Sequence, residues 1–339
     1  MSAQGVLLLF LSCLVLSWVG AHLVRHQAHR WGLITLPNQR SSHQQMTPHG
    51  GGLGMVVVGS AVAMAMALQH PRLGLFGVML MACVMAMLGL VDDLRPQSVR
   101  LRLGVQLLLV GGLLLLWSDV VHTLTLGAWF CLLVGGVWWI NLFNFMDGLD
   151  GFAASEALFM SAVAALISLW GHPERLQDPW WLMLAVLAAV GAGFLIANWP
   201  PARIFMGDVG STWLAYWLLA LALWSVSRGW VSPVSWLLLA GWFVTDATTT
   251  LLTRMLTRQR WYSPHRSHAY QRLARHWGSH RLVTLALWGV NVLWLAPWAF
   301  TASRHPLVLP DGLYLLALLP LFVLVRALGA GRVERNRAI

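Results

Sequence analysis

Asn141-Leu-Phe-Asn-Phe-Met-Asp-Gly-Leu-Asp-Gly151 joins two long apolar segments of the chain. Its Asn141, Asn144, Asp147 and Asp150 recur every three residues, a spacing that keeps side chains near one face of a helix. A carboxylate next to lipid is costly, so such a group is a candidate functional residue. The alternative is a solvated loop whose Asp and Asn cap a helix, and this stretch alone does not decide between the two.

Composition places the chain in a membrane. Of its 339 residues, 58% are hydrophobic and only 10% are charged, and its mean hydropathy is +0.67. Soluble domains carry about 25% charged residues, so the sequence predicts an integral membrane protein without a sizeable soluble domain. The first apolar run has no basic region before it, which favours an uncleaved span. The three cysteines lie inside apolar runs and indicate neither a metal site nor a disulfide framework.

Eleven apolar segments are candidates for membrane helices, each close to the ~20 residues that cross a bilayer. We expect an all-α, polytopic membrane protein with about 11 transmembrane helices in a single domain over residues 1–339. The segments lie near 5–22, 51–68, 73–91, 103–118, 124–142, 152–170, 180–197, 211–227, 233–252, 282–300 and 313–328.

Charge predicts the orientation of these helices. Every basic residue is Arg, and alternating sides place 18 of them on one side of the membrane and 4 on the other. By the positive-inside rule the first side is cytoplasmic, with the N-terminus periplasmic and the C-terminus cytoplasmic. For a membrane protein, a net charge of +10 favours the anionic lipid bilayer over nucleic acid as the partner.

Five cytoplasmic loops carry most of the unusual polar residues, near 23–52, 91–102, 141–152, 197–212 and 253–281. Adjacent carboxylates such as Asp92 and Asp93 repel each other, so the pair requires a cation or a shared proton unless both are exposed helix-capping acids. Asp208 lies between glycines and before an apolar segment, where it either caps a helix or binds a metal. The glycines at 50–52 offer backbone N–H groups for an anion.

The last of these loops is basic. Its His265, Arg266 and His268 either face anionic lipid or bind phosphate groups. Asp246, in the ninth apolar segment, is either a paired acid within the membrane or a site residue, and the sequence leaves both open.

These polar residues together predict phosphoryl transfer at the cytoplasmic membrane face. The set comprises Asp92, Asp93, Asp147, Asp150, Asp208, Asn144, Asn198, His265 and His268. Mg²⁺ prefers oxygen ligands, and Arg and His nearby suit a diphosphate, so we expect a Mg²⁺-dependent transfer that involves a lipid. The chain has no Gly-x-x-x-x-Gly-Lys-Ser/Thr motif and is not a P-loop enzyme. A secondary transporter is the alternative, although transporters place their acids near the bilayer midplane.

Four motifs, in this order, resemble the polyprenyl-phosphate N-acetylhexosamine-1-phosphate transferase family, glycosyltransferase family 4. They are Asp92-Asp93, Asn141-x-x-Asn-Phe-Met-Asp-Gly-Leu-Asp-Gly151, Phe205-Met-Gly-Asp-Val-Gly-Ser211 and Pro264-His-Arg-Ser-His268. The first loop resembles the family's Pro-Asn-x-Arg…His…Thr-Pro-x-Gly-Gly signature, so the likeness extends over about residues 33–281. Two positions depart from the family: Thr35 replaces an acidic residue, and His49-Gly50 replaces the usual Arg before Gly-Gly.

The resemblance implies transfer of a sugar 1-phosphate from a UDP-sugar to undecaprenyl phosphate with release of UMP. It implies a bacterial inner-membrane location, a site facing the cytoplasm, Mg²⁺ (or Mn²⁺ in its place), and it allows a homodimer. The His-Arg-Ser-His loop is similar to the O-antigen-initiating, WbpL-type branch, since the peptidoglycan branch carries consecutive histidines. We therefore expect a UDP-N-acetylhexosamine donor, UDP-FucNAc or UDP-QuiNAc before UDP-GlcNAc, with UDP-N-acetylmuramoyl-pentapeptide as the more distant alternative.

Residue roles also follow from the resemblance. Asp208 corresponds to the Mg²⁺ ligand, and Asp92 to the carboxylate that accepts a proton from, or positions, the lipid phosphate, with Asp93 beside it. Asn144, Asp147 and Asp150 correspond to the nucleotide-sugar pocket and the metal shell. Asn198 and Phe205 correspond to residues that hold the uracil, and His265, Arg266 and His268 to the loop that handles the sugar and diphosphate. Direct attack by the lipid phosphate is expected, with a covalent aspartyl-phosphate as the alternative path.

Overall fold

The computed structural model describes residues 2–35, 46–117, 125–260, 263, 265–304 and 310–333. Residues 36–45 of the first-loop signature and Pro264 of the last motif lie outside these ranges. The only strands in the described part of the chain are β1 (Ile34–Thr35) and β2 (Thr47–Pro48), which pair antiparallel.

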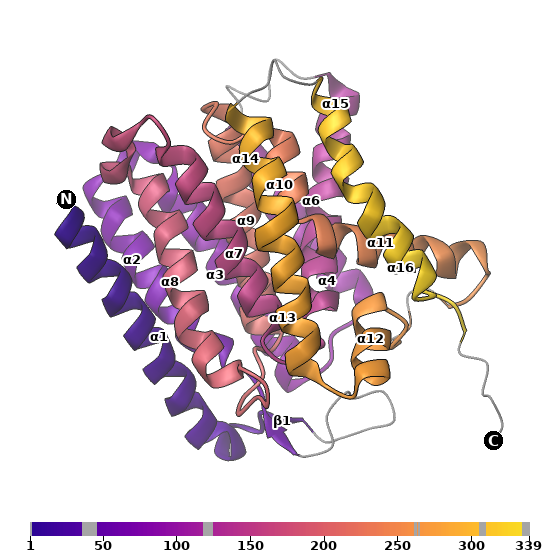
Figure 1. The fold of residues 1–339 in the computed structure, drawn as a ribbon. Coiled ribbons are helices and arrows are strands. Elements are labelled where there is room, and N and C mark those ends of the chain that lie inside the picture. The colour runs from indigo at the N-terminus through magenta and orange to yellow at the C-terminus, as the bar shows by residue number, and fades with distance from the viewer. Residues whose placement is uncertain are drawn as a thin grey trace.

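Long apolar helices make up most of the described chain (Figure 1). Within the described ranges, nine stretches are long and apolar enough to cross a membrane. Eight are single helices: α1 (Ala3–Trp31), α2 (Gly52–Gln69), α3 (Leu75–Leu94), α4 (Val99–Leu116), α6 (Leu126–Met146), α7 (Phe152–Leu169), α8 (Pro179–Asn198) and α9 (Asp208–Ser227). The ninth is a continuous rod made of α13 (His280–Val290), the π-helical η3 (Asn291–Leu295) and α14 (Ala296–Arg304).

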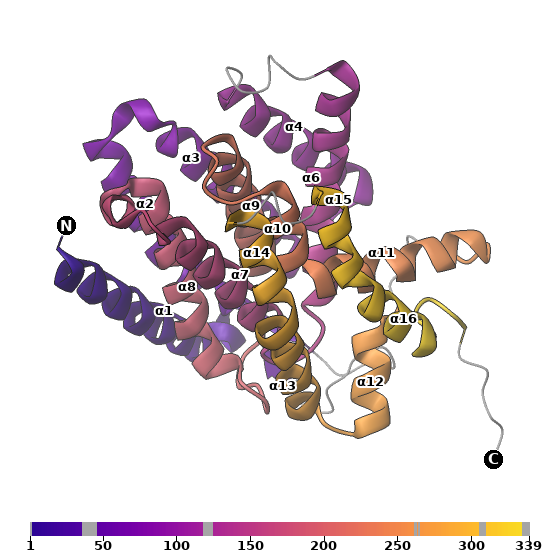
Figure 2. The same cartoon turned by 45° about the horizontal axis from the view of Figure 1, so that its top comes forward.

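Two of the eleven expected segments have a different form. The segment near 233–252 is divided into α10 (Pro233–Leu239) and α11 (Gly241–Leu256), and α11 projects sideways from the bundle (Figures 1 and 2). A Cβ at Gly241 would lie 2.7 Å from the Leu318 side chain, so the break accommodates a close neighbour. The last segment is a shorter apolar helix over Gly312–Ala327, assigned as α15 (Asp311–Tyr314), η4 (Leu315–Leu318) and α16 (Leu319–Ala327).

The prediction of an all-α, polytopic membrane fold is therefore confirmed. The side of the membrane that each terminus faces stays a prediction. The remaining elements are short: η1 (Pro71–Leu73), η2 (Pro173–Gln177) and α12 (Ala269–Trp277).

The most buried helices lie at the centre of the bundle. Most of α7, α8 and α9 is buried, whereas α1 and α4 expose most of their residues. α1 packs on α8, α8 on α7, and α3 on α9. The exposed residues of the outer helices are largely apolar, for example Leu108 at 76% exposure, as expected for side chains that contact lipid.

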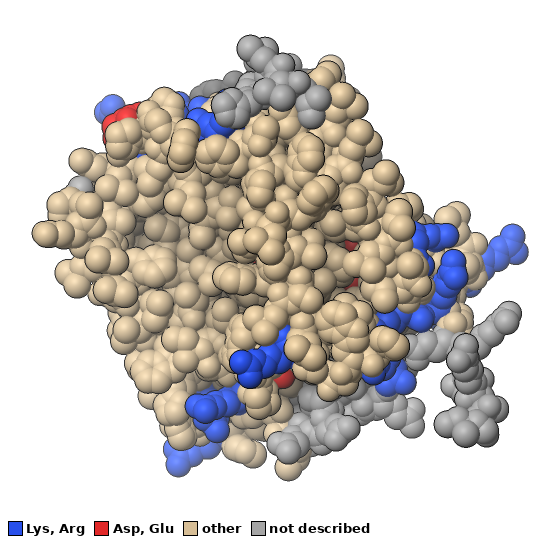
Figure 3. Space-filling model, viewed as in Figure 1, with Lys and Arg blue, Asp and Glu red and all other residues tan. Residues whose placement is uncertain are grey.

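The middle of the face shown in Figure 3 carries little charge. In Figure 3 this region is nearly continuous in uncharged side chains, and most basic ones gather along the lower and right edges, near the end of α11, α12 and α16 as placed in Figure 1. The distribution agrees with the basic side that the Arg count predicts.

Glycines bring three helices close together at the start of α9. A Cβ at Gly52, the first residue of α2, would lie 2.3 Å from the Gly210 Cα, and one at Gly89 of α3 would lie 2.3 Å from the Asp208 carbonyl oxygen. In membranes such small residues let helix backbones approach closely. The N-terminus of α9 is consequently held between α2 and α3, and this contact fixes the position of Asp208.

Candidate active site

Asp208, the first residue of α9, lies at the centre of the candidate site. Its Oδ1 accepts a hydrogen bond from Asn144 Nδ2 at 2.8 Å, and the same amide donates to Ser211 Oγ at 3.0 Å. Its Oδ2 lies 3.8 Å from Arg102 Nη1, and the side chain is 32% exposed. One carboxylate oxygen is thus fixed by Asn144, and the group remains open to a ligand.

Asp93, at the end of α3, caps α9. The backbone N–H groups of Asp208 and Val209 donate to its Oδ1 and Oδ2 at 2.9 and 3.1 Å. A negative charge at this position is also stabilised by the positive end of the α9 helix dipole. Asp93 therefore positions Asp208, and a direct part in the chemistry stays a prediction.

Asp92 forms an ion pair with Arg102. Its Oδ2 accepts from Arg102 Nη1 at 2.7 Å, and its Oδ1 accepts from the Gln97 N–H at 2.5 Å. Arg102 thereby stands between Asp92 and Asp208. The sequence-based set omitted Arg102, because the loop's arginines served there only as orientation signals. A signal was nevertheless available, since a cation in the first turn of α4 is unfavourable unless an anion lies near it.

Asp147 follows the last residue of α6 and is half-buried. Burial raises the pKa of its carboxyl well above the usual range, and the carboxylates of Asp208, Asp93 and Asp150 raise it further. Carboxylates that repel one another in this way are stabilised by a cation or a proton. The predicted group of acids therefore meets in space, although its members come from three separate loops.

Asp150 and Asn198 connect the loops around the site. Asp150 Oδ2 accepts from the Ala202 N–H at 3.0 Å and lies 3.3 Å from His280 Nδ1. Asn198 is buried, with Oδ1 accepting from the Gly151 N–H and Nδ2 donating to the Ile204 carbonyl oxygen, both at 2.9 Å. These contacts hold the loop after α6 against the loop before α9, and the expected contact of Asn198 with uracil stays a prediction.

The backbone of Phe205 pairs with the glycine run of the first loop. Its N–H donates to the Pro48 carbonyl oxygen, and its own carbonyl accepts from Gly51 N–H, both at 2.9 Å. The Gly52 N–H donates to the Met206 carbonyl oxygen at the same distance. The N–H groups of Gly51 and Gly52 are therefore used within the protein and are not available to an anion; for the N–H group of Gly50, anion binding stays a prediction. The role of the half-buried Phe205 ring stays a prediction.

The two histidines of the last motif stack on each other, with ring centroids 5.0 Å apart. Ser267 Oγ lies 3.1 Å from His265 Nδ1, while the Arg266 side chain is exposed. The pKa of His265 is lowered to about 3, chiefly by burial and then by the neighbouring His268 and Arg254. His265 is consequently neutral at physiological pH in the absence of a bound anion.

Asp246 holds this loop in place. It is fully buried, and its two oxygens accept from the N–H groups of Ala269 and Tyr270, each at 2.9 Å. Thr250 Oγ1 adds a bond of 3.0 Å to Oδ1. Oδ1 also lies 3.5 Å from His268 Nδ1. Of the two possibilities that the sequence left open, these contacts show a paired acid, and a direct part in the chemistry stays a prediction.

Tyr270 ties the last motif to the loop after α6. Its hydroxyl donates to the Phe145 carbonyl oxygen at 3.0 Å, and a Cβ at Gly148 would come within 2.3 Å of that hydroxyl. Burial, Asp246 and Asp147 raise the pKa of Tyr270 well above its usual range, so the phenol stays neutral. The glycine after Asp147 is therefore required for this close approach.

A cavity of about 530 Å³ opens beside these residues, between α4, α6, α11 and the last motif. Its lining has a polar part and a larger apolar part. The polar part is Arg102, Asn141, Asn144, Ser263, His265 and His268. The apolar part is Val99, Leu103, Val134, Val137, Trp138, Phe145, Ala247 and Leu251. Asp92 and Asp208 line a much smaller hollow, which shares Arg102, Asn141 and Asn144 with the cavity.

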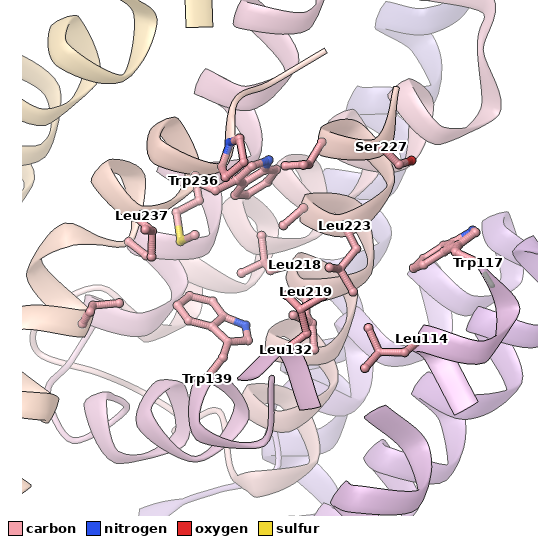
Figure 4. Close-up of a pocket in the computed structure, with 16 residues that line it drawn as sticks. Leu114, Trp117, Leu132, Trp139, Leu218, Leu219, Leu223, Ser227, Trp236 and Leu237 are labelled. Atoms are coloured by element: carbon pink, nitrogen blue, oxygen red, sulfur yellow. The ribbon is translucent and has the colours of Figure 1, made fainter. Parts of the chain in front are cut away.

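A second large cavity, of about 510 Å³, lies away from the site (Figure 4). Its lining is almost entirely apolar and includes Trp117, Trp139, Leu218 and Trp236. None of the site residues predicted from the sequence lines this cavity, so its size alone does not make it part of the site.

A Mg²⁺ site of the kind expected would use few protein ligands. Among the described residues, no three His, Cys, Asp or Glu side chains form a metal-binding cluster. Mg²⁺, however, is usually held by one or two carboxylates and keeps waters and substrate phosphates as further ligands. Asp147 and Asp208 supply two mutually repelling carboxylates of this kind. The donor set fits Mg²⁺ on its chemistry, and metal binding stays a prediction.

Comparison with known proteins agrees with these motifs. The family model described as glycosyl transferase family 4 matches residues 75–226. A phospho-N-acetylmuramoyl-pentapeptide-transferase of Synechococcus is 31% identical over 311 residues, covering 82% of this chain and 83% of its own. A probable undecaprenyl-phosphate N-acetylglucosaminyl 1-phosphate transferase of Bacillus subtilis is 28% identical, with 89% and 84% covered. A decaprenyl-phosphate N-acetylglucosaminephosphotransferase of Mycolicibacterium smegmatis is 28% identical, with 86% and 80% covered. The chain is therefore a multi-pass membrane protein that belongs to glycosyl transferase family 4.

Proposed function

We propose that this protein transfers an N-acetylated sugar 1-phosphate from a UDP-sugar to undecaprenyl phosphate and releases UMP. The reaction takes place at the cytoplasmic face of the bacterial inner membrane and makes the first lipid-linked sugar of an O-antigen chain. The family assignment supports a phosphosugar transferase, and the names of the Bacillus and Mycolicibacterium relatives state polyprenyl phosphates as acceptors.

The observation that carries the proposal is the cavity between α4, α6 and α11, whose lining is part apolar and part polar. Its apolar residues suit a polyprenyl chain, while Arg102 and His265 suit a phosphate. Asn144 lines this cavity and also binds Asp208, so an acceptor phosphate beside Asn144 would lie close to the carboxylates.

In the proposed reaction, an oxygen of the acceptor phosphate attacks the β-phosphorus of the UDP-sugar. The bond between that phosphorus and the bridging oxygen breaks, and UMP leaves with the bonding electron pair. Mg²⁺, held by Asp208 and Asp147, would neutralise charge on the diphosphate. Catalysis then depends mainly on position and charge, as in other phosphoryl transfers. An aspartyl-phosphate intermediate is the alternative, and trapping of labelled protein with donor alone would support it.

The chain's own residues divide into two groups in this reaction. Arg102 lines the cavity and is paired with Asp92, so it is available to an incoming phosphate. His265 lines the same cavity and, being neutral, adds no fixed positive charge there. Asp93, Asp150 and Asn198 act from outside by holding the loops that carry these groups.

The donor is a UDP-N-acetylhexosamine in this proposal. UDP-FucNAc and UDP-QuiNAc are the first expectations from the motif likeness, and UDP-GlcNAc is supported by the names of the Bacillus and Mycolicibacterium relatives. The Synechococcus relative keeps UDP-N-acetylmuramoyl-pentapeptide as the alternative. Competition among these four donors measures the preference directly.

The decisive assay uses membranes that contain the protein, undecaprenyl phosphate, Mg²⁺ and UDP-sugars labelled at the β-phosphate. Label in the lipid phase, with an equal amount of UMP in water, is the expected result. UMP without labelled lipid would mean hydrolysis rather than transfer. Uptake of a substrate into proteoliposomes without UMP would favour the transporter.

A pair of aspartate variants tests the proposed metal ligand. Asp208→Asn keeps the side-chain shape and is expected to abolish nearly all turnover while the protein stays folded in the membrane. Asp178→Asn is the matched control, because Asp178 caps α8 through the Trp180 N–H, on a loop that contains no proposed site residue. Wild-type turnover by Asp208→Asn at saturating Mg²⁺ would exclude Asp208 as an essential ligand.

A further inference from the structure

A carboxyl group and an amide are buried together between α7 and the rod formed by α13, η3 and α14. Glu156 of α7 and Asn291 of η3 are each 1% exposed. Asn291 Nδ2 donates to Glu156 Oε2 at 2.5 Å. Neither residue belongs to the motifs or lines the cavities described above, so the candidate site does not account for them.

The hydrogen-bond count of this pair is incomplete if Glu156 is ionised. Glu156 Oε1 and Asn291 Oδ1 are both buried without a partner among the described residues. An ionised carboxylate and an amide oxygen are both acceptors, so neither can satisfy the other. No Arg or His in the described part of the chain forms an ion pair with Glu156. An unpaired carboxylate at such a position is strongly unfavourable.

We propose that Glu156 is a protonated carboxylic acid that donates its proton to Asn291 Oδ1. The acid and the amide then form a reciprocal pair, in which each group donates one hydrogen bond and accepts one. All four polar atoms of the two side chains are satisfied by a single proton, without any counter-ion.

The acid–amide pair also belongs to a row of polar contacts that joins α13 and η3 to α7 and to the loop before α7. His280 lies 3.3 Å from Asp150 Oδ2, and Thr284 Oγ1 donates to the Asp150 carbonyl oxygen at 3.0 Å. Positions 280, 284 and 291 are separated by four and seven residues and so share one helix face. Lipid supplies little hydrophobic drive for helices to associate, so polar contacts have a large part in fixing their relative position.

Glu156 is therefore a positioning residue, which holds α13 where it supports Asp150 and the loop that Asp150 binds. This part of the inference rests on the proposed function, because Asp150 matters for turnover only if the site is the one described. The protonation of Glu156 does not depend on that function and is tested separately.

Turnover separates the protonated acid from an ionised one. Glu156→Gln keeps the shape and both hydrogen bonds of a neutral group, and its kcat is expected within about twofold of wild type, since no polar atom becomes unsatisfied. Glu156→Ala leaves Asn291 unpaired, and its kcat is expected to fall about tenfold, the equivalent of one buried unsatisfied group of about 1.4 kcal/mol. Equal losses in the two variants would overturn the proposal.

A double variant tests mutual dependence. Asn291→Leu alone leaves the buried Glu156 carboxyl without a partner, whereas Glu156→Leu/Asn291→Leu leaves no polar atom of the pair. The double variant should therefore have a higher thermal midpoint than Asn291→Leu. A double variant less stable than that single one would mean that Glu156 is satisfied by another group.

Infrared spectroscopy tests the proton without any substrate. The difference spectrum between wild type and Glu156→Gln should contain the carbonyl band of a protonated carboxylic acid. Glu174→Gln is the matched control, because Glu174 is exposed beside His172 and should contribute no such band. A band of ionised carboxylate in the Glu156 difference spectrum would refute the protonation. If the band is present but no donor sugar gives labelled lipid, the proposed function fails and the protonated pair stands.

Discussion

Replacing Asp246 by Ala should release the loop that carries the two stacked histidines. Asp246 is fully buried and accepts three hydrogen bonds, from the N–H groups of Ala269 and Tyr270 and from the Thr250 hydroxyl. Alanine removes both acceptor oxygens and all three hydrogen bonds at once. The two N–H groups belong to the first turn of α12, where no backbone carbonyl within the helix is available to them.

The expected cost follows from the number of donors left without a partner. Each buried unsatisfied group costs about 1–3 kcal/mol, and loss of a helix cap costs about 0.5–2 kcal/mol. Because water reaches the opened loop, the lower end of the range applies. About 1 kcal/mol for each of the three donors, the two N–H groups and the Thr250 hydroxyl, gives about 3 kcal/mol for the local structure. At about 1.4 kcal/mol for each factor of ten, opening at these amides becomes roughly 100-fold more frequent.

Hydrogen–deuterium exchange measures this opening directly. In Asp246→Ala, the amides of Ala269 and Tyr270 should exchange roughly 100-fold faster than in the wild type. Transferase turnover should fall in parallel, because His265 and His268 belong to the polar part of the cavity lining. Asp178→Ala removes an aspartate cap from α8 instead, and should leave both quantities unchanged.

Unchanged exchange at Ala269 and Tyr270 would refute the reasoning, because protection of these N–H groups would then not depend on Asp246. Fast exchange with unchanged turnover would have a different meaning. It would show that Asp246 caps α12 as described but that the histidine loop does not limit the reaction.

Three further predictions concern the charged groups of the site. Arg102→Leu should lower turnover at least tenfold, because it removes the cation between Asp92 and Asp208. Arg102→Lys should retain part of the wild-type turnover, since Lys keeps the charge but lacks the planar fork of Arg. Equal kcat in the two variants would contradict this role. Asp93→Ala should lower the free energy of unfolding by the cost of one cap, about 1 kcal/mol, and Asp93→Asn should lower it by less. Thermal unfolding in detergent measures both changes as a lower midpoint. The pKa of His265 falls from 6.5 to about 3 on folding, so its contribution to stability is complete above pH 6.5 and is lost as the pH falls toward 3. Wild type should therefore lose thermal stability below pH 6.5 more steeply than His265→Gln. Parallel pH profiles of the two proteins would contradict the pKa shift.

Local sequence was sufficient to predict the membrane fold. Apolar length predicts membrane helices because a bilayer requires it, and each of the eleven expected segments is present in helical form. The two that differ, α10–α11 and the helix over Gly312–Ala327, come close to each other where Gly241 approaches the Leu318 side chain. Apolar periodicity does not report such a contact, and it did not predict the division into α10 and α11.

Residue partners could not be predicted in the same way. Asp93 and the N–H groups it accepts from are 115 and 116 residues apart, and Asp246 and its partners are 23 and 24 apart across a loop. Arg102 was counted among the arginines that orient the chain, although a cation in the first turn of α4 requires a nearby anion. Two arginines of the sparsely charged side, Arg175 and Arg304, donate to carbonyl oxygens at the end of α7, so their role includes helix capping as well as orientation.

The acids of the membrane face divide by what their oxygens accept. Asp93 and Asp246 each use both oxygens to accept N–H groups at the start of another helix, and Asp150 holds a backbone N–H of the neighbouring loop. A carboxylate occupied in this way fixes geometry and has little capacity left for a metal or a phosphate. Asp147 and Asp208 differ, because the first has a pKa raised by its acidic neighbours and the second is fixed mainly through one oxygen. The abundance of acids at this face thus reflects two needs, since helix ends within a membrane require buried acceptors as much as the reaction requires charge.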